Sequence, residues 1–259
     1  MVSYQSALKK SRKGPGVSAA FLKLLALVTM TIDHFAVVII RNGKLYGYSQ
    51  EYYQMAIATE TGQRWLRLYT LCRYVGRVSF PIFAFLLVEG FIHTSDFWKY
   101  FRRVFIMALL AEVPYDLCFY NETYNFAAQN TGFTLATALL VMYFMKRWRS
   151  HVELKWLSVI AGCAIAEYLH FDYGALAILM ISLMYNFRKE KNLSMLSLAV
   201  FSAINSKETY CLAALAAIPV FFYNGERGRF RLHRFPYFYY PLHLAVMYLM
   251  IYIGSLITT

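Results

Sequence analysis

The sequence has 259 residues, of which 59% are hydrophobic, 18% are aromatic and 15% are charged. Soluble domains carry about 25% charged residues and about 45–50% apolar ones. Here the apolar residues fall in continuous runs of about 16–23 residues, which is the length of a helix that crosses a bilayer. The composition is therefore not that of a soluble domain, a disordered chain or a transmembrane barrel.

We predict an all-α integral membrane protein with about nine transmembrane helices. The predicted spans cover residues 18–40, 72–92, 100–120, 131–145, 154–169, 173–187, 193–205, 210–223 and 236–257. The seventh is short for a full crossing, which takes about 20 residues, so it is tilted, partly buried in protein or not a complete span.

The chain divides into a polar segment, residues 1–17, and a single multispan membrane domain, residues 18–259. Within this domain, residues 41–71 interleave tyrosine and tryptophan with polar side chains. Such a pattern is typical of an outer interfacial segment. A lid over an outward-facing site is the alternative interpretation.

The distribution of basic residues predicts the orientation of the chain. With the N-terminus inside, the inner loops hold about 19 of the 26 lysines and arginines, in agreement with the positive-inside rule. The N-terminus is then cytoplasmic and the C-terminus external. Most of the net charge of +12 is explained by this orientation, so nucleic acid is not an expected partner.

Ionisable side chains inside a span are costly and mark functional positions. The first predicted span contains Lys23, Asp33 and His34. His34 lies about 16 Å further along the helix axis than Lys23, in the outer half of the span. It is either a neutral imidazole bonded between helices or a catalytic base, since the pKa range of histidine suits neutral pH.

Two pairs of charged residues with four-residue spacing stand at the outer ends of the second and third spans. Arg73 and Arg77 share one helix face, and so do Glu112 and Asp116. Because neighbouring antiparallel helices place the pairs at similar depth, we expect the arginines to face these two carboxylates. The group is either a structural ion cluster or a site in which one member orients His34 or binds substrate.

Other polar positions carry less specific signals. The turn with Glu167, His170 and Asp172 is expected to be solvated, and no cluster of histidine or cysteine predicts a metal site. The basic loop 224–234 is either an orientation signal that contacts anionic lipid or a clamp for phosphate.

Four stretches of the sequence resemble the TraX family of membrane proteins, named for the conjugative pilin acetylase. They are residues 22–34, 76–94 (GRVSFPIFAFLLVEGFIHT, the most specific), 111–117, and 223–228 with 240–244 downstream. The resemblance covers residues 19–251. It implies a multi-pass acetyltransferase of the bacterial cytoplasmic (inner) membrane that uses acetyl-CoA.

The resemblance also implies kinship with the multispan acyltransferases that modify O-antigens and cell-wall glycans. In that class a basic residue and a histidine separated by ten residues lie in the first span, and Lys23 and His34 match this spacing. An arginine pair with two intervening residues is also common there. Arg73 and Arg77 have three residues between them and do not match it.

On this interpretation His34 is the general base. Glu112 or Asp116 is a better orienting carboxylate than Asp33, which points about 100° away around the helix. Arg73 or Arg77 stabilises the oxyanion or holds a carboxylate of the acceptor. The candidates for contact with acetyl-CoA are the inner basic residues for its phosphates and two residues for its arm: Arg102, Arg103, Arg227, Arg229 and Arg231, then Lys23 and His243.

The acceptor implied by the resemblance is a peptide N-terminal amine, or a hydroxyl of a glycan or lipid. Membrane lipids are the other expected partners. Two further classes of function remain open from the sequence. A proton-coupled transporter also keeps intramembrane histidines and charges, although no internal repeat favours it. A non-enzymatic membrane assembly protein is the third candidate.

Overall fold

The structure, a computed structural model, describes residues 16–228, 232 and 234–258. The expected polar segment 1–17 therefore lies almost entirely outside the described residues. Within them the main elements are helices, so the all-α prediction is confirmed for this part of the chain. The helices are α2 (Ala19–Phe35), η1 (Ala36–Lys44), α3 (Gln50–Ile57), α4 (Glu60–Gly76), α5 (Ser79–His93), α6 (Phe97–Tyr120), α7 (Thr131–Arg147), α8 (Val152–Tyr168), α9 (Gly174–Asn186), α10 (Lys191–Asn205), η2 (Lys207–Thr209), η3 (Leu212–Ala216), α11 (Ala217–Phe221) and α12 (Phe235–Thr258).

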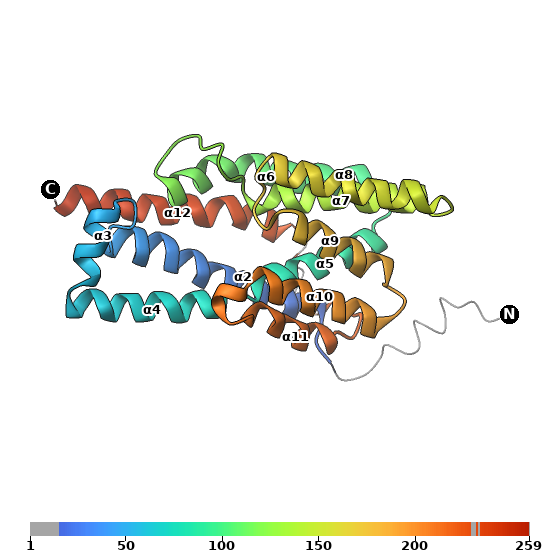
Figure 1. Cartoon of the computed structure of the whole chain (residues 1–259), viewed down its shortest axis with the longest axis horizontal. Coiled ribbons are helices and arrows are strands. Elements are labelled where there is room, and N and C mark those ends of the chain that lie inside the picture. Colours follow the sequence, from blue (N-terminus) through green and yellow to red (C-terminus); the bar gives the residue numbers. More distant parts are fainter. Residues whose placement is uncertain (1–15, 229–231, 233, 259) are drawn as a thin grey trace.

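The helices run roughly along the long axis of an elongated bundle (Figure 1). One end is built from η1, α3, α4 and α12, and the other from α5 and α7–α11. α2 packs against α4 and α5, and α12 packs against α6. The cavity described below lies between these helices.

Short polar side chains fix where several helices begin. Ser18, Thr59, Asp96 and Asn130 each accept a hydrogen bond from a backbone N–H in the first turn of α2, α4, α6 and α7, respectively. Such caps satisfy donors that the helix itself leaves without a partner. Four helix starts that define the bundle are therefore encoded locally in the sequence.

The second predicted span, residues 72–92, lies within the 34-residue stretch Glu60–His93, which is long and apolar enough to cross a membrane, but it is not one regular helix. The structure divides it between α4 and α5, with a turn at Arg77 and Val78. Pro81 lacks the N–H that would bond the carbonyl group of Arg77, which explains a break at this point. Together α4 and α5 extend over 34 residues, about 51 Å of helix, which is longer than an apolar bilayer core of about 30 Å.

The eighth predicted span, residues 210–223, is also wrong as a continuous helix. Tyr210 and Cys211 adopt left-handed backbone conformations, with φ of 54° and 60°. The five-residue 3-10 helix η3 and the five-residue α11 follow. Ten helical residues are too few to cross a bilayer core.

The interfacial segment predicted for residues 41–71 is only partly irregular. The π-helix η1 covers its first residues, and α3 and the first part of α4 occupy the remainder. The side chains of Asn42 and Tyr48 donate hydrogen bonds to the carbonyl group of Cys118, at 2.9 and 2.7 Å. Burial raises the pKa of Tyr48 to about 12, so its hydroxyl remains a hydrogen-bond donor even at alkaline pH.

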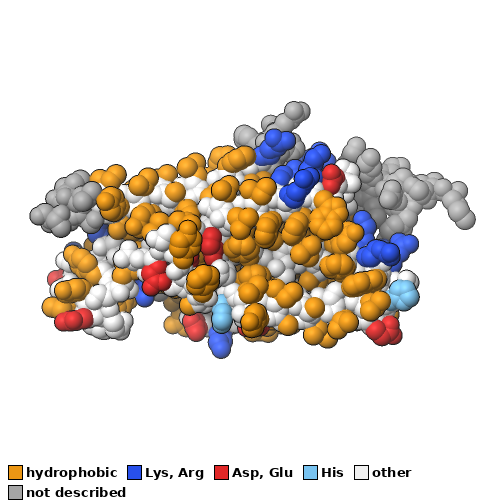
Figure 2. Space-filling model, turned by 90° about the horizontal axis from the view of Figure 1, so that it is seen from above, with side chains coloured by type: hydrophobic (Ala, Val, Ile, Leu, Met, Phe, Trp, Pro, Cys, Tyr) orange, Lys and Arg blue, Asp and Glu red, His pale blue; other side chains and the backbone are white. Residues whose placement is uncertain are grey.

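Two helical stretches are long and apolar enough to cross a membrane by length and composition, Ala19–Lys44 and Glu60–His93. Gly174–Asn186 and Leu212–Phe221 are shorter apolar helices. Many large apolar side chains are nevertheless exposed along the bundle, and Figure 2 shows them spread over most of the visible face. Lysine and arginine gather mainly toward the right-hand end of that view. The number of crossings stays a prediction.

The predicted orientation gives a labelling experiment. Ser150 and Glu122 are exposed and lie in the loops that follow and precede α7, at its two ends. In a background with the native cysteines replaced by alanine, Ser150→Cys should react with a membrane-impermeant maleimide only after the cytoplasmic side is opened. Glu122→Cys should react in intact cells. The reverse pattern would contradict the orientation.

Candidate active site

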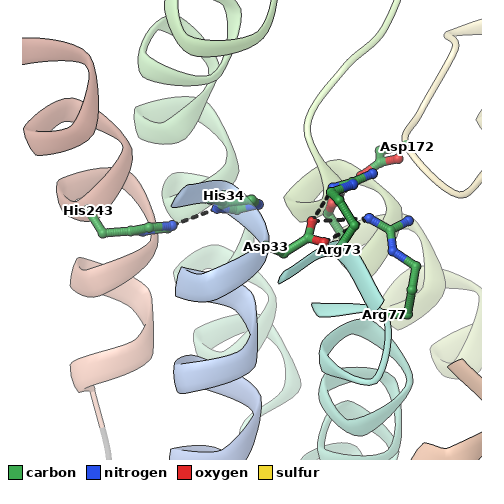
Figure 3. A network of polar contacts seen from close by, with 7 residues as sticks. Asp33, His34, Arg73, Arg77, Asp172 and His243 are labelled. Atoms are coloured by element: carbon green, nitrogen blue, oxygen red, sulfur yellow. Dashed lines mark hydrogen bonds and ion pairs between the residues drawn. The ribbon is translucent and has the colours of Figure 1, made fainter. Parts of the chain in front are cut away.

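The charged residues of α2, α4 and the following turn meet in one ion cluster. The carboxylate of Asp33 accepts a hydrogen bond from Arg73 at 2.5 Å and from Arg77 at 2.9 Å. The side chains are largely shielded, with exposed fractions of 13% for Asp33, 23% for Arg73 and 15% for Arg77. One buried carboxylate therefore holds two guanidinium groups together (Figure 3).

A glycine makes this close approach between α2 and α4 possible. A Cβ atom at Gly76 would lie only 2.2 Å from Oδ1 of Asp33. The Ser79 hydroxyl, at the start of α5, donates to the carbonyl group of Ala26 on α2 at 2.9 Å. The junction of α4 and α5 is thus fastened to α2 immediately beside the ion cluster.

His34 points away from Asp33 and contacts α12 instead. Its Nδ1 lies 2.6 Å from Nε2 of His243, and Figure 3 shows the two rings facing each other. The Nδ1 of His243 lies 2.8 Å from the carbonyl oxygen of Tyr239. One turn earlier, the hydroxyls of Thr31 and Tyr239 are 2.6 Å apart, so two polar contacts join α2 to α12.

When both rings are neutral, this chain of hydrogen bonds determines which ring nitrogens carry the protons. The carbonyl oxygen of Tyr239 can only accept, so Nδ1 of His243 is the donor and its Nε2 is the acceptor. Nδ1 of His34 then donates to His243. The remaining Nε2 of His34 carries a lone pair and is suited to accept a proton.

The predicted pairing of the arginines with Glu112 and Asp116 is wrong. Glu112 accepts hydrogen bonds from the backbone and side chain of Asn130, and Asp116 accepts one from the backbone of Asn125 at 2.9 Å. Both carboxylates therefore hold the loop between α6 and α7. The contact with His34 that we assigned to one of them is made by His243.

One cavity of 1190 Å³ joins the candidate residues of both sides. One end of it is lined by Asp33, His34, Arg73 and Arg77. The other end is lined by basic side chains, and the wall between is mainly apolar. We call this second group the basic pole; it consists of Lys23, His93, Arg103 and Arg227.

The glycine-bearing loop before α12 places Arg227 in the basic pole. The backbone N–H groups of Ala19 and Ala20 lie at the start of α2, where the helix itself offers them no partner. They donate hydrogen bonds to the carbonyl oxygens of Glu226 and Arg227, at 2.8 and 3.1 Å. Gly228 has φ of +80°, and a Cβ there would meet Oγ of Ser18 at 2.5 Å. Only glycine suits both the conformation and the contact.

The structure brings together only some of the residues that we predicted to contact the coenzyme. Lys23, Arg103 and Arg227 share the cavity, and Arg103 lies over the rings of Tyr100 and Tyr237. Arg102 is exposed and does not line it. Arg229 and Arg231 lie outside the described residues. His243 contacts His34, so it belongs to the histidine end of the site and not to a path that leads from the basic pole.

The cavity is also lined by polar residues that the sequence analysis did not assign to the site, among them Asp172, Tyr173, Asn205 and Tyr240. The solvated turn expected around Asp172 is wrong for this residue, because its carboxylate accepts a hydrogen bond from Thr131 at 2.6 Å. An acidic residue directly before the apolar run 173–187 was the signal for it. No three His, Cys, Asp or Glu side chains gather as a metal site in the part of the chain that the structure describes.

The fold and the site together define an apolar helical bundle in which a histidine and paired charges line one cavity. The chain belongs to the TraX family, whose sequence profile, described as TraX protein, matches residues 18–251. It is 27% identical to the probable fimbrial assembly protein FimC, serogroup H1, of Dichelobacter nodosus. That match covers 89% of this chain and 94% of the relative. No solved structure matches the chain.

The ion cluster predicts the effect of neutralising Asp33. Asp33→Asn leaves two shielded guanidinium groups without their counter-charge, so we expect the free energy of unfolding to fall by about 3–5 kcal/mol. Thermal unfolding in detergent measures this. Glu60→Gln is the matched control, since its pair with Arg64 is 2.5 Å long but highly exposed and contributes little. Equal, small shifts in both variants would contradict the structural role of Asp33.

Proposed function

We propose that this protein is a membrane-embedded acetyltransferase that moves an acetyl group from acetyl-CoA to an amine or a hydroxyl. The observation that carries the proposal is the cavity with two different ends. One end holds a histidine with one free ring nitrogen beside two arginines, and the other end is the basic pole. Membership of the TraX family supports the same assignment.

The basic pole suits the phosphate groups of the donor. Lys23, Arg103 and Arg227 supply three cations, and arginine matches phosphate geometry. Apolar side chains such as Leu27, Met30 and Phe83 line the stretch toward His34. This lining suits the extended, uncharged arm that carries the thioester. A donor from the cytoplasm would then reach the histidine through the protein.

The transfer is a proton removal followed by an acyl exchange. Nε2 of His34 takes the proton of the acceptor N–H or O–H as its N or O attacks the thioester carbonyl carbon. Arg73 or Arg77 stabilises the oxyanion that forms. The carbon–sulfur bond then breaks, the coenzyme leaves with its sulfur, and the imidazolium of His34 returns the proton to that sulfur.

The proposed location is the bacterial cytoplasmic membrane, with several crossings. It is supported by the two long apolar helical stretches and by the many exposed apolar side chains. The name of the relative from Dichelobacter nodosus, a fimbrial assembly protein, makes a subunit peptide amine one candidate acceptor. A glycan or lipid hydroxyl suits His34 equally well.

A non-enzymatic role in assembly is the second candidate, and the printed name of the same relative favours it. The deciding experiment is incubation of the purified protein with acetyl-CoA while free thiol is followed. Acceptor-dependent thiol release supports the enzyme. If no release occurs with a peptide, glycan or lipid acceptor, and a His34→Asn variant still restores fimbriae in cells, the assembly role stands.

The mechanism predicts that two substitutions at His34 lower activity for a chemical reason and not through loss of structure. His34→Ala should lower kcat by about 10²–10⁴-fold, because the general base is lost. His34→Asn should be nearly as inactive, since an amide does not take the proton. His243→Ala should lower kcat less, because it only orients the base. Activity and melting temperature are measured together, and an active, stable His34→Asn protein would remove His34 from the mechanism.

The basic pole predicts effects on donor binding. Arg103→Ala and Arg227→Ala should raise the KM for acetyl-CoA more than they lower kcat, since contacts remote from the reaction bind ground state and transition state alike. Arg102→Ala is the control, because this neighbouring arginine does not line the cavity. Initial-rate kinetics decide, and an equal effect of all three would place the phosphate site elsewhere.

A further inference from the structure

A second, smaller pocket of 290 Å³ lies on the other side of the end of α5. It is lined by Phe91 and Ile92 of α5, whereas Gly90 and His93 line the large cavity. The two share no lining residue. The small pocket is therefore a separate place on the molecule.

Four cations from different parts of the chain line this pocket. They are Lys146 at the end of α7, Arg149 in the following turn, Lys155 on α8 and Arg188 after α9. No carboxylate lines the pocket, and none of these four makes an ion pair within the described residues. We call this group the cation pocket.

Several of these cations are held by neighbouring groups and not simply extended into solvent. The guanidinium of Arg188 lies 4.5 Å from the ring centroid of Tyr185 and donates to the carbonyl oxygen of that residue at 2.9 Å. Lys155 donates to Asn186 at 2.5 Å, and Lys146 lies over the ring of Phe91. A set of fixed like charges is costly unless an anion offsets their repulsion.

We propose that the cation pocket binds an anionic phosphate group. The helix that carries Lys155, α8, also exposes the apolar side chains of Val152, Leu154 and Leu157, which offer a surface for acyl chains. The headgroup of an anionic lipid therefore fits both the charge and the surroundings, and a soluble diphosphate shares the same phosphate chemistry. The proposal is independent of the acetyltransferase function, because it concerns different residues.

The test compares two double variants with the same loss of charge. Arg149→Gln with Arg188→Gln alters the pocket, whereas Arg102→Gln with Arg147→Gln removes two exposed arginines that do not line it. Purified proteins in non-ionic detergent are titrated with phosphatidylglycerol or phosphatidylcholine, and bound lipid is counted by native mass spectrometry. We expect phosphatidylglycerol to bind the pocket variant about 10–30-fold more weakly, and the control like the wild type.

Competition with inorganic diphosphate separates the two sources of phosphate. Displacement of the lipid at low concentration would support the phosphate site and assign it to a soluble ligand. Equal losses in both double variants, or equal binding of phosphatidylcholine, would overturn the proposal. Loss of Arg188 could weaken the fold. The single variant Arg149→Gln, at an exposed turn residue, keeps the test valid in that case, because it too should weaken binding of phosphatidylglycerol.

Discussion

The structure depends on the attraction between Asp33 and two arginines in an otherwise apolar bundle. A shielded charge is costly unless it is paired, so Asp33, Arg73 and Arg77 fix the distance and rotation of α2 against α4. Gly76 permits the contact because any side chain would collide with the carboxylate. The break between α4 and α5 occurs at the residue that carries the second guanidinium group.

This constraint also positions His34. Adjacent residues on a helix point about 100° apart, so a helix that turns Asp33 toward α4 directs His34 elsewhere. The direction it takes is toward α12, where Thr31 and His34 meet Tyr239 and His243. One face of α2 therefore carries Asp33 of the ion cluster, and an adjacent face carries His34. Both side chains line one cavity without pairing with each other.

Several elements could be predicted closely from local signals. The predicted spans 100–120, 131–145 and 154–169 differ from α6, α7 and α8 by at most three residues at any end, because continuous apolar runs and capping residues specify helices directly. The predictions failed where the backbone departs from a regular helix. Pro81 interrupts the second span, and left-handed residues precede the short helices of the eighth.

For the site, the sequence by itself determined which side chains are chemically unusual. Lys23, Asp33, His34, Arg73 and Arg77 stand out because charge inside apolar runs is costly. Only the tertiary structure decided their partners. Asp33 and Arg73 are 40 residues apart, and His34 and His243 are 209 residues apart. Such contacts depend on how whole helices rotate and slide during packing, which no local pattern specifies, and the same reason explains why Glu112 and Asp116 hold a loop instead of facing the arginines.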